Sequence, residues 1–153
     1  MTETPLTSNL HQLIPEFLLA IFGLAVLTID LILPHQKKMV AAYASVAGLV
    51  IVLLISLLLY TNSDTHSLYG GLIIIDNYSI FFRNFFLILG IVIVISSIGF
   101  TNNNLGNKGE YFGIILFSIL AMNLMAASAE LLTAYISLEL MSFCFYILVS
   151  YST

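Results

Sequence analysis

A single carboxylate near the middle of a long apolar segment is the residue of this chain best suited to chemistry. Glu139 lies within residues 131–151, whose other side chains carry no charge. Placing a carboxylate at the centre of a bilayer costs about 2.5–3.5 kcal/mol, so such residues usually serve a function. Tyr135, Ser142 and Tyr146 are spaced so that they share one helical face with this acid. The pattern predicts a polar stripe along an otherwise apolar helix.

Two uses of Glu139 are open from the residues alone. Buried carboxyl groups carry protons in the relays of pumps and transporters. The alternative is a neutral acid that hydrogen-bonds between helices as a packing residue. The chain offers no obvious cation at the same depth, because Lys37, Lys38 and Lys108 fall in loops and Arg83 lies near a helix end. Glu139 is then either held neutral by neighbouring hydroxyls or paired with a cation on another chain or in a missing region.

The composition indicates an integral membrane protein. Of the 153 residues, 60% are hydrophobic and 8% are charged, whereas soluble domains contain about 25% charged residues. The net charge of −4 and the scattered cations argue against a nucleic-acid partner. Residues 1–10 contain Glu3 and no Lys or Arg, which is not the pattern of a secretory signal peptide.

Five apolar segments have the length needed to cross a bilayer, about 20 residues each. Backbone groups in lipid must be satisfied within the segment, so each segment is expected to be a helix. We predict a single all-α membrane domain with five transmembrane helices at residues 13–33, 40–60, 79–100, 111–127 and 131–151. The short connection at residues 128–130 implies that the last two helices pack antiparallel.

The basic residues predict the orientation of the chain in the membrane. Lys37, Lys38 and Lys108 lie in loops expected on one side, and the other two loops carry no Lys or Arg. The positive-inside rule then places the N-terminus outside and the C-terminus inside.

Other polar residues in the apolar segments are secondary candidates. Glu16 and Asp30 share a stripe with small residues, which suits close packing against another helix. Acids near helix ends ordinarily reach headgroups or water, and this is the expectation for both. Asn123 is interpreted as a helix–helix hydrogen bond rather than a ligand. Arg83, one turn into the third segment, is expected to extend outward toward Asp76.

Enzymatic sites of the usual kinds find little support in the sequence. It contains no glycine-rich phosphate loop, no Cys/His ligand cluster and no nucleophile–base pair. His11, His35 and His66 fall outside the expected helices, which argues against haem ligation between helices. Asp64, His66 and Asp76 are expected to be solvated rather than to bind a metal. We therefore predict no catalytic residue, no metal site and no cofactor bound by this chain.

Residues 130–148 resemble the fifth-helix signature of the antiporter-like subunits of NADH:quinone oxidoreductase, respiratory complex I. The form Leu-Glu-Leu-x-Ser-x-x-x-Tyr, from Leu138 to Tyr146, is closer to the subunit called 2, or N in bacteria, than to its larger paralogues. The resemblance covers essentially the whole chain. Further matches lie at Pro15-Glu16, at Asp30, at residues 76–82 and at residues 110–112.

The resemblance implies a subunit of the membrane arm that couples NADH oxidation and quinone reduction to proton pumping. Glu139 matches the family's fifth-helix glutamate, which pairs with a lysine on a later helix. Flavin, iron–sulfur clusters and quinone are bound elsewhere in such a complex. The implied partners are the lipid bilayer and the other membrane-arm subunits.

The chain is shorter than the members of this family. They continue into inverted repeats that contain broken helices, whereas this chain holds only three helices and the first two of a repeat. The resemblance therefore implies that the remainder lies on another chain or that the sequence is truncated.

Two other functions stay open. The chain could be a subunit of a related cation/proton antiporter or membrane-bound hydrogenase, or a non-catalytic membrane scaffold in which Glu139 only packs. The many Ile and Asn residues are typical of an AT-rich genome. With the missing signal peptide, they favour the mitochondrial inner membrane over a bacterial plasma membrane or a thylakoid.

Overall fold

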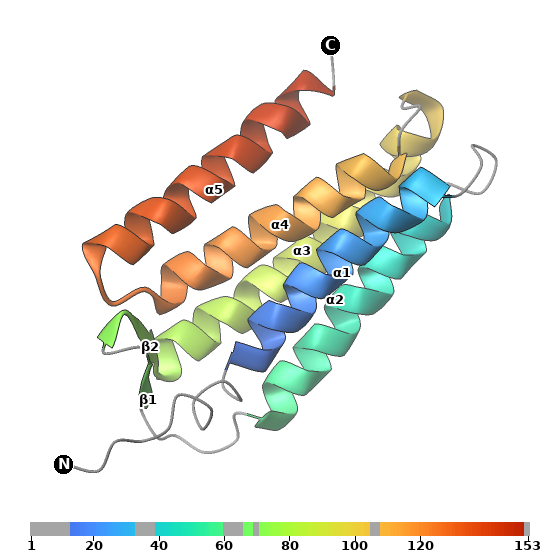
Figure 1. Ribbon diagram of the computed structural model, residues 1–153. Coiled ribbons are helices and arrows are strands. Elements are labelled where there is room, and N and C mark those ends of the chain that lie inside the picture. Colours follow the sequence, from blue (N-terminus) through green and yellow to red (C-terminus); the bar gives the residue numbers. More distant parts are fainter. Residues whose placement is uncertain (1–12, 33–38, 60–65, 69–70, 105–107, 152–153) are drawn as a thin grey trace.

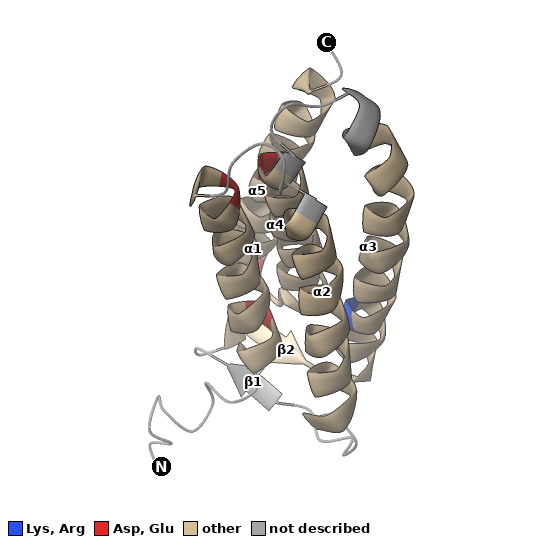
Figure 2. Cartoon of the chain, turned by 90° about the vertical axis from the view of Figure 1, so that its right-hand side faces the viewer, with Lys and Arg blue, Asp and Glu red and all other residues tan. Residues whose placement is uncertain are grey.

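The computed structural model describes residues 13–32, 39–59, 66–68, 71–104 and 108–151. Most of them belong to five helices: α1 (Ile14–Ile32), α2 (Met39–Leu59), α3 (Asn77–Asn104), α4 (Lys108–Ala127) and α5 (Leu131–Ser150). Each helix is long and apolar enough to cross a membrane. The prediction of an all-α membrane protein with five spanning helices is confirmed. Few charged residues interrupt these helices (Figure 2).

The first four helices form a bundle, and α5 lies along α4 on the outside of it (Figure 1). α4 packs against all the other helices, most extensively against α1 and α5. The apolar core contains Leu19 of α1, Leu49 of α2, Leu87 of α3 and Leu116 of α4. α5 contributes little to this core, since its buried residues are Ser137 and Cys144. The last two helices run antiparallel, as their short connection predicts (Figure 1).

A short β-hairpin lies where α1 and α3 begin and α2 and α4 end, and we call this the hairpin end of the bundle (Figure 1). β1 (His66–Leu68) pairs antiparallel with β2 (Ile73–Ile75). Ile73 also forms a bridge with Ser128, which ties the hairpin to the connection between α4 and α5. The hairpin lies between the second and third predicted spans, where no strand was predicted. The missed signal is Gly70-Gly71 before a run of isoleucines.

α3 starts earlier and ends later than predicted. At its start, Ser79 N–H donates to Asp76 Oδ1 and Asp76 N–H donates to Ser79 Oγ, both at 2.8 Å. This reciprocal capping lets the helix begin at Asn77. At its end, buried Thr101 donates its hydroxyl to Ser97 O at 2.7 Å, so the helix passes the expected end at residue 100 without exposing that group.

Candidate functional site

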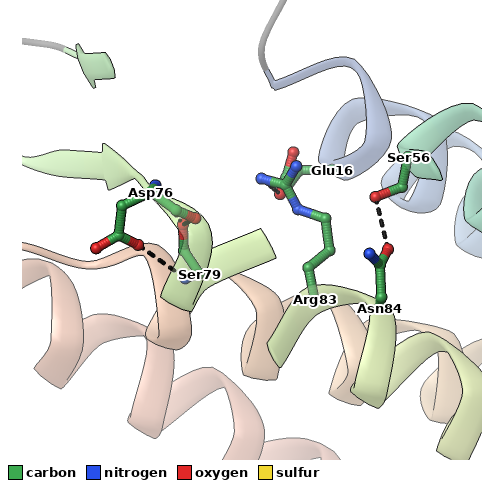
Figure 3. Close-up of polar contacts among 6 residues, drawn as sticks. All are labelled: Glu16, Ser56, Asp76, Ser79, Arg83 and Asn84. Carbon is green, nitrogen blue, oxygen red and sulfur yellow. Dashed lines mark hydrogen bonds and ion pairs between the residues drawn. The ribbon is translucent and has the colours of Figure 1, made fainter. Parts of the chain in front are cut away.

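A buried ion pair between α1 and α3 is the main electrostatic feature of the bundle interior. Arg83 Nη2 lies 2.5 Å from Glu16 Oε1, and the two side chains are 1% and 5% exposed. Figure 3 shows the guanidinium of Arg83 beside the carboxylate of Glu16. The prediction that Arg83 extends outward toward Asp76 is wrong.

The reason lies in the face of α3 that carries Arg83. This residue shares its helical face with Ser79, Leu87 and Val94, all of which are buried against the bundle. A charge on that face needs a partner of opposite sign, because an unpaired buried charge is very costly. Glu16 supplies that partner from α1. Asp76 instead caps the start of α3.

Both acids of α1 are buried, which corrects the expectation that they reach headgroups or water. Asp30, at the far end of α1, is 6% exposed. Its Oδ1 accepts a hydrogen bond of 3.1 Å from Gly109 N–H in the first turn of α4. The first N–H groups of a helix have no partner within the helix, and a carboxylate near them also interacts favourably with the helix dipole. Asp30 therefore caps α4 from a neighbouring helix.

The small-residue stripe of α1 packs against α4, as its composition predicts. Three contacts define the antiparallel register: Asp30 with Gly109, Leu27 with Gly113, and Gly23 with Phe117. A side chain at position 109 would collide with Asp30, so this contact requires glycine. Close approach of the two backbones is what small residues permit in membrane helices.

Asn123 lies on the buried side of α4 near the hairpin end, and it is 2% exposed. Its carbonyl oxygen accepts no hydrogen bond from the described residues. The helix–helix hydrogen bond expected of Asn123 stays a prediction. A second interhelical contact at the same end joins α2 to α3, where Ser56 Oγ donates to Asn84 Oδ1 at 2.8 Å (Figure 3).

Glu139 occupies the middle of α5, where its side chain is half-buried. The side chain of Tyr135, one turn earlier, interacts with it. The hydroxyl of Ser142 instead donates to Leu138 O of its own helix at 2.9 Å. Tyr135 and Tyr146 are 59% and 72% exposed, so the polar stripe faces largely away from the described bundle.

Tyr151, directly after α5, joins that helix to α4 at the end opposite the hairpin. Its hydroxyl donates to Glu110 Oε2 at 2.6 Å, and its ring lies edge-on to that of Tyr111. Burial, and then the hydrogen bond to the Glu110 carboxylate, raise the pKa of Tyr151 above its ordinary value. Sequence analysis did not single out this contact.

The structure thus groups the candidate residues differently from the sequence analysis. Glu16 and Asp30 are engaged inside the α1–α3–α4 core, whereas Glu139 belongs to the outer helix. A signal for the missed ion pair was present. Glu16 and Arg83 both lie near the start of helices that begin on the same predicted side of the membrane, so they share one depth.

Some predictions fall on parts of the chain that the structure does not describe. Lys37, Lys38 and the side chain of Lys108, which carry the orientation prediction, lie outside the described residues. The same holds for Asp64 and the side chain of His66. Among the residues that are described, no group of three or more His, Cys, Asp or Glu side chains could hold a metal ion.

Five helices that are long and apolar enough to cross a membrane define a multi-pass helical membrane protein. The chain matches no protein-family model. It is 33% identical over 94% of its length to NADH-quinone oxidoreductase subunit N of Desulforamulus reducens. The subunits N of Trichlorobacter lovleyi and Heliobacterium modesticaldum are 32% and 34% identical over 95% and 94% of the chain. Nearly all of this chain is therefore homologous to NADH-quinone oxidoreductase subunit N, and the resemblance found in the sequence is confirmed. The chain spans about 30% of the length of each of these relatives.

Proposed function

We propose that this chain works in the proton-translocating membrane arm of an NADH:quinone oxidoreductase, with Glu139 as a proton-carrying group. The observation that carries the proposal is the similarity of nearly the whole chain to subunit N. Five helices able to span a membrane agree with that role. The chain itself binds no flavin, iron–sulfur cluster or quinone in this proposal, and redox chemistry belongs to other subunits.

The position of Glu139 supports a part in proton transfer. Glu139 is the ninth residue of α5, so at 1.5 Å per residue it lies about 12 Å from the start of that helix. A proton reaches a carboxyl at such depth only through protein groups or water. Tyr135, whose side chain interacts with Glu139, is a hydroxyl-bearing neighbour in the direction of the hairpin end.

The exposure of the α5 stripe supports a further part of the proposal. A carboxylate at membrane depth needs polar or charged partners. Among the described residues, half-buried Glu139 interacts with Tyr135, on a helical face whose two tyrosines are largely exposed. We propose that other membrane-arm segments cover the stripe and bring a cation to Glu139. These segments belong either to the remainder of a subunit like the relatives or to a separate chain.

Replacing Glu139 with Gln in the assembled complex tests the proton role. Glu139→Gln keeps the size of the side chain and removes its titration. We expect NADH-driven proton pumping in membrane vesicles to fall at least tenfold and coupled quinone reduction to fall with it. A native gel should show normal assembly. The matched control is Glu130→Gln at the N-cap of α5, because Glu130 is exposed and its side chain makes no capping hydrogen bond. Normal pumping by a fully assembled Glu139→Gln complex would remove Glu139 from the proton path.

The subunits that co-purify with the chain test its assignment to this complex. We expect quinone-reductase subunits in the detergent-solubilised complex. Recovery of antiporter or hydrogenase subunits would support those alternatives instead. If Glu139→Gln is silent while the complex assembles, the chain acts as a scaffold.

We also propose the mitochondrial inner membrane as its location, on the basis of the Ile- and Asn-rich composition. The relatives named above are bacterial. Fractionation of the source cells decides between the two, because a bacterial chain would sediment with the plasma membrane.

A further inference from the structure

Apart from the Glu16 oxygen that pairs with Arg83, two buried oxygen atoms of the described residues lack a hydrogen-bond donor. Oε2 of Glu16 and Oδ1 of Asn123 accept no hydrogen bond from any described residue. Their residues are 5% and 2% exposed, so bulk water does not reach them. Buried polar atoms almost always have a partner, either in the protein or in an ordered water molecule. These two oxygens therefore need an explanation.

The helix register brings the two oxygens to the same level. Asp30 of α1 contacts Gly109 of α4, and the two helices run antiparallel. Glu16 precedes Asp30 by fourteen residues, and Asn123 follows Gly109 by fourteen residues. Fourteen residues make about four helical turns. Glu16 therefore lies on the same face of α1 as Asp30, and Asn123 lies on the same face of α4 as Gly109. The register thus sets Glu16 opposite Asn123.

The chemistry of the site defines what binds between them. Oε1 of Glu16 already pairs with Arg83 (Figure 3), an ion pair in which Glu16 takes part as the carboxylate. The carboxylate oxygen Oε2 and the amide oxygen of Asn123 are both acceptors, so the ligand must donate two hydrogen bonds. It must also be neutral, because the ion pair has no net charge. Water meets these conditions, and buried waters typically make two to four hydrogen bonds.

We propose that Glu16 and Asn123 hold a buried water molecule between α1 and α4, beside the Arg83 guanidinium. The water donates one O–H to Glu16 Oε2 and the other to Asn123 Oδ1. The site is near the hairpin end, since Glu16 is the third residue of α1 and Asn123 is four residues from the end of α4. It is independent of Glu139 and of any role for that residue in proton transfer.

A density map of the assembled complex that resolves ordered waters tests the site directly. We expect a density peak within hydrogen-bond distance of both Glu16 Oε2 and Asn123 Oδ1. A map in which the Asn123 amide N–H donates straight to Glu16, with no density between them, would overturn the proposal. A map in which apolar side chains separate Glu16 Oε2 from Asn123 Oδ1 would also overturn it.

Hydroxyl-radical footprinting in ¹⁸O-labelled water gives a second test in the same complex. Radicals formed from a bound water oxidise the side chains beside it. Leu19 and Leu120 each lie one turn from the site and are 1% and 8% exposed. We expect both to incorporate label several-fold faster than Leu49, which is equally apolar and 0% exposed. Labelling no faster than that of Leu49 would show that the site is dry.

Two variants sharpen this comparison. Asn123→Leu removes one of the two acceptors, so labelling of Leu19 and Leu120 should fall to the level of Leu49. Asn84→Leu is the matched control, because the Asn84 oxygen already has Ser56 as its donor. We expect it to leave the labelling unchanged. Equal loss of labelling in both variants would contradict a water bound at Asn123. If Asn123→Leu does not assemble, the comparison with Leu49 in the unaltered complex still decides.

Discussion

At the scale of single residues, the described bundle is held by charged and polar groups that meet across helices. Arg83 and Glu16 neutralise each other inside the protein. Asp30 caps a helix to which it does not belong. Neither contact follows from the composition of one helix, because each depends on which residues of two helices reach the same depth. The acids and the arginine in apolar segments are visible in the sequence, and so is the shared depth of Glu16 and Arg83. The helix faces that meet are not, because they depend on how the helices pack.

Removing one member of the buried ion pair should destabilise the bundle strongly. Arg83→Met leaves the Glu16 carboxylate unpaired in the core, a change that typically costs about 3–5 kcal/mol. We expect a lower Tm and less assembled complex on native gels. The double variant Glu16→Gln with Arg83→Met should recover most of this loss, since no charge remains buried. Equal instability of the single and double variants would mean that the pair acts by shape rather than by charge.

Gly109 should tolerate no side chain. A methyl group there would collide with Asp30, so Gly109→Ala must separate α1 from α4 or break the cap. We expect a loss of about 1–3 kcal/mol, as for other overpacked core positions. Gly99→Ala is the control, because a methyl at that position meets nothing within 4 Å and alanine favours a helix. Thermal unfolding of both variants measures the difference, and similar Tm values would contradict the close contact at Gly109.

At the scale of elements, the apolar lengths predict five helices, and the three-residue connection predicts the antiparallel packing of α4 and α5. The extension of α3 and the hairpin were not predicted. Thr101 and Asp76 look like loop residues in the sequence. Yet the Asp76 side chain caps the start of α3, and the Thr101 hydroxyl bonds to Ser97 O within the helix. The polar stripe of α5 follows from its helical spacing. The side toward which it faces does not, because that depends on the rotation of α5 against α4.

Tyr151 gives the packing of α5 on α4 a predictable dependence on pH. Its pKa is raised in the folded protein, mainly by burial, so folding favours the neutral phenol. This contribution is complete below the ordinary pKa of tyrosine, about 10, and is lost as the pH rises through the higher folded value. The α5 amides should therefore exchange slowly near neutral pH, and their exchange should accelerate beyond the intrinsic rise at strongly alkaline pH. In Tyr151→Phe, the α5 amides should exchange faster at neutral pH. As the pH rises, their exchange should accelerate only as much as the intrinsic exchange rate of amides does. An identical pH profile for the variant would show that another group is responsible.

At the scale of the whole molecule, burial is distributed unevenly. Within the spans, 56% of α4 is buried but only 11% of α5. The outer helix α5 also carries Glu139, the residue proposed to carry protons. In the proposed function, other membrane-arm segments complete the α5 surface.

A photo-crosslinker placed at Tyr146, which is 72% exposed, tests this coverage. In the assembled complex we expect a protein adduct on illumination, because the proposed function places a polypeptide over the stripe. The same probe in the chain expressed without other subunits should give lipid adducts. Lipid adducts in both preparations would show that the stripe faces the bilayer.

The Glu16–Arg83 pair also has a consequence for how the protein is made. Translation delivers α1 to the membrane well before α3 and α4, so the ribosome releases Glu16 and Asp30 long before Arg83 and Gly109 exist. Until then, neither the ion pair of Glu16 nor the cap that Asp30 places on α4 has formed. The insertion machinery, or water at the edge of the bilayer, must shelter this first helix until the third and fourth arrive. Stable insertion of α1 therefore depends on helices that are synthesised later, because α1 is fully packed only once α3 and α4 lie against it.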